Sequence, residues 1–240
     1  MNDGVLDKHY AHQRITKKYL QFRYKMRALV ACSVIKKYLH QTNPIHLVDF
    51  GAAEGLTLME MARILGEGEY TGIEFDESLI KSAPLVPDGI RLIQGNVSHC
   101  PMKDSSVDVI TALALMEHLQ HPEEALKEAA RILKTGGLFV ATAPVPFWDR
   151  HTDFLHTKET FGAKAHMTDM GEDMMRNMAK KSGLHMVEYS KFMLAPVGFL
   201  PYLKISISPR IARSIDGILQ KTHLFGWLYV NQCFVLQKIT

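Results

Sequence analysis

The sequence contains few cysteines, and they form no recognisable pattern. Cys32, Cys100 and Cys233 are the three thiols in 240 residues, and they are odd in number and far apart. No CxxC pair or Cys/His ligand spacing is present, which argues against a zinc site. Unpaired thiols of this kind favour a reduced protein in a cytoplasmic setting. We therefore expect no metal site and a cytoplasmic localisation.

Long apolar runs are also missing. The first seven residues lack the apolar core of a signal peptide, and no stretch reaches the roughly 18 apolar residues that suggest a spanning helix. The chain is 47% hydrophobic and 22% charged, which is ordinary for a soluble globular protein and excludes extensive disorder. We expect a soluble protein, with a peripheral membrane contact left open.

Charge is nearly balanced overall but unevenly distributed. The formal net charge is +3, yet nine of the 28 Lys and Arg residues lie within the first forty positions. Two interpretations of this basic segment remain open. It is either the solvated face of a helix or an electrostatic docking surface for an acidic substrate, a membrane or nucleic acid.

One stretch combines a buried-strand pattern, a glycine-rich turn and a helical pattern. Residues 45–50 predict a strand, residues 56–65 predict a helix, and Gly51 and Gly55 lie between them. A strand, tight turn and helix in this order bring backbone N–H groups to one point, which a ligand can approach because glycine has no Cβ. The sequence therefore predicts a cofactor cradle, with the acid Asp49 two residues before its first glycine.

Polar side chains follow the next two predicted strands. Glu74 ends the strand pattern of residues 70–74, about twenty residues after the glycine turn, where α/β cofactor folds place a carboxylate that accepts from the ribose hydroxyls. Phe75 suits contact with a flat adenine ring, and Asn96 offers an oxygen to an exocyclic amine. The alternatives are a surface glutamate at a strand end and an asparagine that caps a turn.

Four motifs occur in an order that resembles the class I S-adenosylmethionine (SAM) methyltransferases. The D-x-G-x-A-x-G spacing of residues 49–55 is similar to their first motif, with Ala53 in place of the middle glycine. Residues 100–110 resemble the stretch before the fourth strand in a large branch of that family. Glu117-His118-Leu119 resembles its E-H-L segment, and residues 131–140 its helix-to-strand corner. The resemblance covers residues 45–145 and resumes more weakly over 166–189.

The resemblance implies an α/β fold with a doubly wound, Rossmann-like sheet, mostly parallel with an antiparallel last strand. We expect one domain over residues 1–240, whose parts are an N-terminal helical cap (1–44), a SAM-binding core (45–145) and two lid or substrate insertions (146–165 and 194–227). The helical pattern of residues 10–40 allows one break. The second insertion contains an amphipathic segment, for which packing as a lid and docking to a membrane or partner are both open.

The resemblance also implies SAM as the cofactor, S-adenosylhomocysteine as the product, and a set of binding residues. The glycine turn would admit the methionine part, the acid before it would hold the amino group, Glu74 would take the ribose, and the residues after the second and third strands would contact adenine. Ala112, expected just beyond the fourth strand, would offer its carbonyl to the amino group. The implied cofactor-binding residues are Asp49, Gly51, Ala53, Gly55, Glu74, Phe75, Asn96, Val97 and Ala112.

Two histidines are candidates for a general base. His118 follows the fourth predicted strand near the expected methyl group, where a neutral imidazole can take a proton from an acceptor. A structural His118 is an equal alternative, because the E-H-L segment occurs in that branch whatever the substrate. His151 lies in the first insertion, where substrate-specific residues are expected.

Three functions compete on this evidence. A SAM-dependent methyltransferase acting on a small-molecule or lipid-like acceptor is favoured, because two apolar-aromatic insertions flank the expected pocket. An NAD-dependent oxidoreductase is disfavoured by the turn spacing and by the lack of a suitably placed Tyr-x-x-x-Lys pair. A non-catalytic binding module on a membrane surface is the alternative. Nucleic acid is not expected as a partner, because the net charge is low, and both a monomer and a homodimer remain open.

Overall fold

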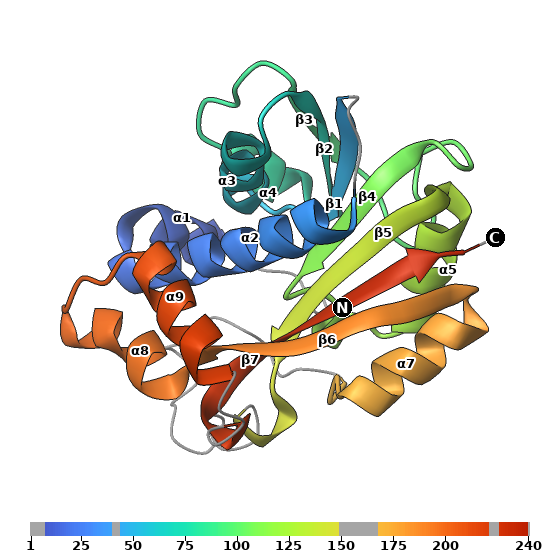
Figure 1. Cartoon of the computed structure of the whole chain (residues 1–240). Coiled ribbons are helices and arrows are strands. Elements are labelled where there is room, and N and C mark those ends of the chain that lie inside the picture. Colours follow the sequence, from blue (N-terminus) through green and yellow to red (C-terminus); the bar gives the residue numbers. More distant parts are fainter. Residues whose placement is uncertain (1–7, 40–43, 149–167, 221–225, 240) are drawn as a thin grey trace.

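A seven-stranded sheet forms the centre of the structure (Figure 1). The computed structural model describes residues 8–39, 44–148, 168–220 and 226–239. The strands are β1 (Ile45–Phe50), β2 (Gly68–Glu74), β3 (Ile90–Gln94), β4 (Val107–Leu113), β5 (Leu133–Pro144), β6 (Leu184–Leu194) and β7 (Tyr229–Lys238). The α-helices are α1 (Lys8–Thr16), α2 (Lys18–Tyr38), α3 (Leu56–Leu65), α4 (Glu77–Lys81), α5 (Pro122–Ile132), α7 (Glu172–Lys181), α8 (Ala195–Phe199) and α9 (Pro209–Gln220). Short 3-10 helices are η1 (Met116–His118), η2 (Leu200–Leu203) and η3 (Gly226–Leu228).

The strand order confirms the expected fold class. The sheet runs β3-β2-β1-β4-β5-β7-β6, and the first five of these strands pair in parallel. β7 pairs antiparallel with both β5 and β6, so the last strand is the reversed one. The chain order reverses direction beside β1 and β4, and α/β sheets bind ligands beyond the carboxyl ends of their strands at such a point.

Helices cover both faces of the sheet, which explains why the central strands β1 and β4 are almost wholly buried. Alternate residues of each strand enter different cores. Leu47 and Val109 belong to the core that includes residues of α2 and α3, whereas Val48 and Ile110 belong to the core that includes residues of α5 and α7. Figure 1 shows these helices around the sheet. The period of two along each strand thus fixes which side chains reach each core.

The N-terminal basic segment forms two helices with one break, as the sequence pattern allows. The break is at Lys17, whose backbone is extended, with φ −92° and ψ 118°. α2 packs against α3 on the sheet and also against α9 and η2 from the C-terminal part of the chain. Among the helices in the described ranges, none combines the length and the apolar character needed to cross a membrane.

The C-terminal insertion is attached to the sheet by a buried carboxylate. Asp216 of α9 accepts hydrogen bonds from the backbone N–H groups of Met193 (2.7 Å) and Leu194 (3.1 Å). Burial raises the pKa of Asp216, and these two hydrogen bonds oppose the shift. The amphipathic segment expected at residues 210–219 is α9. The expected insertion, residues 194–227, begins at Leu194, which is also the last residue of β6.

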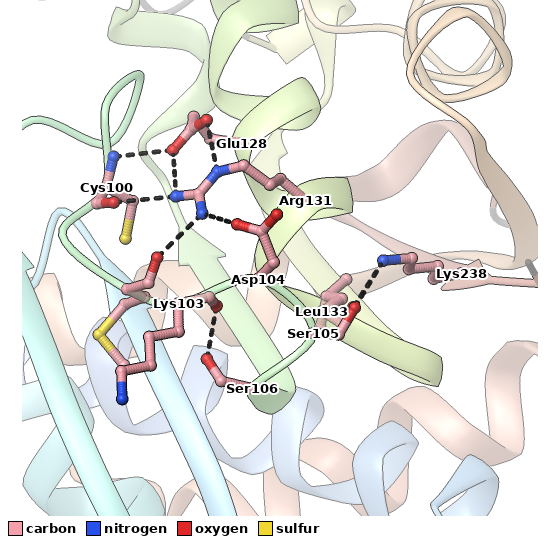
Figure 2. Close-up of polar contacts among 10 residues, drawn as sticks. Cys100, Lys103, Asp104, Ser105, Ser106, Glu128, Arg131, Leu133 and Lys238 are labelled. Carbon is pink, nitrogen blue, oxygen red and sulfur yellow. Dashed lines mark hydrogen bonds and ion pairs between the residues drawn. The ribbon is translucent and has the colours of Figure 1, made fainter.

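Arg131 fastens the loop before β4 to α5 (Figure 2). Its guanidinium donates to the carbonyls of Cys100 and Met102, both at 3.0 Å, and pairs with Asp104. It also forms a two-point contact with Glu128, at 3.0 and 2.8 Å, and Glu128 in turn accepts from the Cys100 N–H at 2.9 Å. The motif residues at 100–110 and 131–140 are therefore joined by one planar cation, which suits such a forked arrangement.

We predict that Arg131→Gln lowers the free energy of unfolding by about 1 to 2 kcal/mol, because glutamine cannot satisfy both carbonyls and both carboxylates. Urea denaturation followed by circular dichroism measures this change. Lys127→Gln, an exposed cation on the same helix, is the matched control and should change stability by less than about 0.5 kcal/mol. Equal losses in the two variants would contradict the structural role of Arg131.

Candidate functional site

The turns that follow β1, β2 and β3 are joined at one edge of the sheet. The N–H groups of Gly51 and Ala52 both donate to the carbonyl of Ile73, at 2.9 and 3.1 Å. The N–H of Gly95 donates to the carbonyl of Glu74 at 2.9 Å. The ends of the three strands are thus held together by backbone hydrogen bonds. The residues predicted to bind the cofactor follow these strands at the same edge.

The side chain of Glu74 bridges the end of β2 and the glycine-rich turn. One carboxylate oxygen accepts from the Ala53 N–H at 2.9 Å, and the other accepts from the Asp76 N–H at 3.0 Å. The residue is only 8% exposed. Each carboxylate oxygen carries two lone pairs, so both oxygens can still accept from a ligand hydroxyl. Glu74 is therefore a buried acid at this edge of the sheet and not a glutamate on the open surface.

The turn itself uses left-handed backbone at three positions. Gly51, Ala53 and Gly55 have φ values of +70°, +49° and +80°. An L-residue in this region is strained by about 1 to 2 kcal/mol, which explains why glycine suits the first and third positions. A Cβ built on Gly51 would lie 2.7 Å from Cδ1 of Leu115, so the turn is also closely packed.

Ala53 departs from the glycine of the motif, and its methyl group packs with apolar neighbours. It is 1% exposed and clusters with Ala11 of α1 and Leu79 of α4. The methyl group therefore contributes contacts between the turn and the N-terminal helix. These contacts offset part of the backbone strain at this position.

Asp49 is a buried acid at the end of β1. It is 2% exposed, and its Oδ1 accepts from the hydroxyl of Thr111 on β4 at 2.6 Å. The pKa of Asp49 is raised to about 7: burial is the main cause and the negative charge of Glu74 adds to it, while the Thr111 hydrogen bond and Arg14 oppose the shift. A cationic ligand beside this carboxyl group would stabilise its charged form, because the attraction offsets the cost of burying the negative charge.

The N-terminal helix α1 is fastened over the turn by Arg14. Nε of Arg14 lies 3.2 Å from Oε1 of Glu54, and its Nη2 donates to the hydroxyl of Thr57 at 2.8 Å. Glu54 is fully buried, and burial raises the pKa of its carboxyl while Arg14 opposes the shift. α1 also packs against α4. The sequence predicted a helical cap here but did not single out the arginine that attaches it.

The expected adenine-binding residues follow β2 and β3. Phe75 is 62% exposed directly after Glu74, and its carbonyl accepts from the side chain of Gln94 at 3.2 Å. Asn96 is exposed, and its Oδ1 accepts from the Ser98 N–H at 2.9 Å. It therefore caps a turn, which is the alternative role that the sequence allows. Val97 is nearly buried. Contacts of these residues with adenine remain a prediction.

The remaining predicted residues have different outcomes. Ala112 does not lie beyond the fourth strand but inside β4, fully buried and opposite Ala141 of β5, because the strand continues to Leu113. His118 lies in η1, which follows β4 at the same edge of the sheet. His151 is outside the described residues. In the part of the chain that the structure describes, no cluster of His, Cys, Asp or Glu side chains could hold a metal ion.

Two further residues at this edge were not predicted. Thr111 binds Asp49, and Leu115 covers Gly51. Thr111 is the one polar residue in the run from Val109 to Leu113, and this is the signal that could have found it. Leu115 is one apolar residue among several, so no signal in the sequence separates it from core residues.

Comparison with known proteins agrees with this geometry. Residues 48–141 match the family described as "Methyltransferase domain". A probable S-adenosylmethionine-dependent methyltransferase of Mycolicibacterium smegmatis is 24% identical over 139 residues, which cover 55% of this chain and 52% of that protein. A demethylmenaquinone methyltransferase of Lactiplantibacillus plantarum is 29% identical over 109 residues, covering 42% of this chain and 46% of that protein. The chain thus spans about half the length of these curated relatives.

A solved structure extends the agreement to the whole fold. The structure is that of a putative methyltransferase in complex with the Haloferax volcanii Trm112 methyltransferase activator, and it covers 97% of this chain and 95% of its own, with a TM-score of 0.65 and 18% identity. The likeness in fold therefore extends beyond residues 48–141 to nearly the whole chain. On the family match and the fold, this chain contains a methyltransferase domain over residues 48–141 and has the class I methyltransferase fold.

Proposed function

We propose that this protein transfers a methyl group from SAM to a small-molecule or lipid-like acceptor by in-line displacement. The observation that carries the proposal is the hydrogen bond from the Ala53 N–H to the Glu74 carboxylate. It brings together, at one edge, the acid expected to take ribose hydroxyls and the turn expected to admit the methionine part. The non-catalytic binding module stays as the alternative, and an acceptor screen with labelled SAM separates the two.

The donor set of the site fits SAM. Glu74 and Asp49 supply two carboxyl groups to a ligand that carries ribose hydroxyls and an ammonium group, and the left-handed turn leaves no side chain at Gly51 and Gly55. When bound, SAM supplies a methyl group that its sulfonium already activates. The protein's task is then to orient the acceptor and exclude water, and such orientation is worth roughly 7 to 11 kcal/mol of barrier.

We assign roles to the residues of the site on this basis. Asp49 holds the amino group directly or through water, with the Ala112 carbonyl as a second acceptor. Glu74 binds the ribose, and Phe75 lies against the adenine ring, with Asn96 and Val97 at its edge. His118 is the base candidate at the end of β4. A general base contributes about a hundredfold to ten-thousandfold, so its loss would leave measurable transfer.

The acceptor class is proposed from the residues where the two insertions meet. Nε1 of Trp148, in the first insertion, donates to the carbonyl of Trp227, in the second, at 2.8 Å. Phe147 and Trp227 are 51% and 63% exposed beside this contact. Exposed aromatic rings at a junction of insertions suit an apolar acceptor. The name of one relative, a demethylmenaquinone methyltransferase, agrees with a lipid-like acceptor for that protein.

We predict that Glu74→Gln weakens SAM binding about tenfold to a hundredfold, because the amide loses the charge and one of the two acceptor oxygens. Isothermal titration of the purified protein with SAM measures the dissociation constant. Glu69→Gln, an exposed acid in the same strand, is the matched control and should bind SAM as the unaltered protein does. Unchanged affinity in a folded Glu74→Gln protein would remove Glu74 from the site.

The pH dependence of binding tests Asp49. Its folded-state pKa of about 7 lies above the usual value for an aspartate, so the carboxyl is partly protonated near neutrality before ligand binds. A ligand ammonium favours the charged carboxylate and lowers this pKa, so binding releases a proton. We predict that SAM affinity rises between pH 5.5 and 7, by up to about tenfold per pH unit.

Calorimetry in buffers of different ionisation enthalpy measures both the affinity and the proton release. Asp49→Asn should bind weakly and with a flat pH profile over this range, whereas Asp88→Asn, at an exposed loop position, should keep the slope of the unaltered protein. An affinity that is constant or that falls with rising pH in the unaltered protein would rule out the ammonium contact of Asp49.

A further inference from the structure

The basic residues of this protein are concentrated on two segments that pack together. Residues 8–38 and 195–220 contain twelve Lys and Arg residues and one acid, whereas the rest of the chain contains sixteen basic and twenty-four acidic residues. The single acid, Asp216, is fully buried and engaged by backbone N–H groups. α2 packs directly against α9 and η2, and α1, the start of α2, α8 and α9 gather at one end of the molecule, whereas the C-terminal part of α2 reaches β1 (Figure 1).

Several cations at this end are not used by the fold. Arg14 pairs with Glu54, and Lys37 pairs with Glu188. Lys18, Lys204 and Arg210 are exposed, and none of them has an acidic partner within the residues that the structure describes. Their charges therefore face solvent and give this end a positive potential.

Exposed aliphatic side chains alternate with these cations. η2 ends at Leu203, and the chain then turns through Lys204, whose φ of +61° is left-handed. On either side of this turn Leu203 is 70% exposed and Ile205 is 51% exposed, and Ile211 at the start of α9 is 57% exposed. Single exposed aliphatic residues are ordinary, but three of them within nine positions form a projecting apolar tip.

A cavity connects this tip to the start of α2. Lys18 and Lys204 both line it, together with Phe22, Pro201 and Ile207. Two ammonium groups from different segments therefore flank apolar walls. This combination suits an anionic headgroup with an acyl chain, because the charge and the hydrocarbon are met by adjacent surfaces.

We propose that this basic-apolar end, comprising Lys18, Leu203, Lys204, Ile205, Arg210 and Ile211, docks on the surface of an anionic lipid bilayer. The cations face lipid phosphates, and the aliphatic tip enters the boundary between headgroups and acyl chains. Nucleic acid would meet the same charges but would leave the aliphatic tip in water. The proposal goes beyond methyl transfer and depends on none of the residues assigned to it.

Vesicle flotation with the full chain tests this docking. The unaltered protein should float with vesicles of phosphatidylcholine and phosphatidylglycerol in equal amounts, and should stay free with phosphatidylcholine alone. Binding should weaken strongly between about 0.1 M and 1 M salt. Each basic residue near an anionic leaflet contributes about fivefold to binding, so Lys18→Glu/Lys204→Glu should lower partitioning by at least about 25-fold.

Matched variants separate docking from general charge and hydrophobicity. Lys127→Glu/Lys180→Glu makes the same charge change on exposed positions of α5 and α7, and Leu85→Ser/Ile239→Ser removes exposed aliphatic residues elsewhere. Both controls should keep vesicle binding, whereas Leu203→Ser/Ile205→Ser should lose most of it. The proposal would be overturned if the protein bound neutral and anionic vesicles equally, or if the controls lost as much binding as the test variants. It would also be overturned if a short single-stranded DNA bound more tightly than the vesicles and this DNA binding were lost in Lys18→Glu/Lys204→Glu.

Thermal unfolding and SAM titration of every variant are measured alongside. Because the altered residues lie outside the cofactor site, SAM affinity should be the same in all of them. A protein that fails to bind SAM but still floats with anionic vesicles would contradict the proposed methyl transfer and leave the docking surface standing, so the two failures are distinguishable.

Discussion

The candidate site depends on one buried carboxylate. Glu74 accepts from the Ala53 N–H with one oxygen and from the Asp76 N–H with the other, which locks the end of β2 to the turn after β1. Without this bridge the turn would be held to the neighbouring strand by backbone bonds to Ile73 alone. The group that organises the turn is also the one proposed to bind the ribose, so the proposal links cofactor binding to local order at this position.

The turn is also shaped by what lies above it. Ala53 adopts a left-handed conformation that glycine would adopt with less strain, yet its methyl group packs with Ala11 and Leu79. Arg14 adds a charged attachment between α1 and the start of α3 through Glu54 and Thr57. The departure from the glycine motif is therefore coupled to the N-terminal helix. The alanine adds backbone strain to the turn, and its methyl group adds contacts with α1.

Local pattern explains which parts of the fold could be predicted. The strand at residues 45–50 and the helix at 56–65 have the expected bounds, because each lies between glycine, proline or polar residues that end it. Glu74 was predicted from its distance along the chain, but its hydrogen bond to Ala53 was not. That contact, like the ones made by Arg14 and Thr111, joins residues far apart in sequence, and no local pattern encodes it. The position of Ala112 was wrong because apolar residues continue past the expected strand end.

The Glu74-linked turn is proposed to hold SAM, and the decisive experiment is a crystal structure of the protein with S-adenosylhomocysteine. We expect the ribose hydroxyls within hydrogen-bond distance of Glu74, the amino acid part beside Gly51 and Asp49, and adenine against Phe75. A ligand bound elsewhere, or one whose ribose makes no contact with Glu74, would contradict the account.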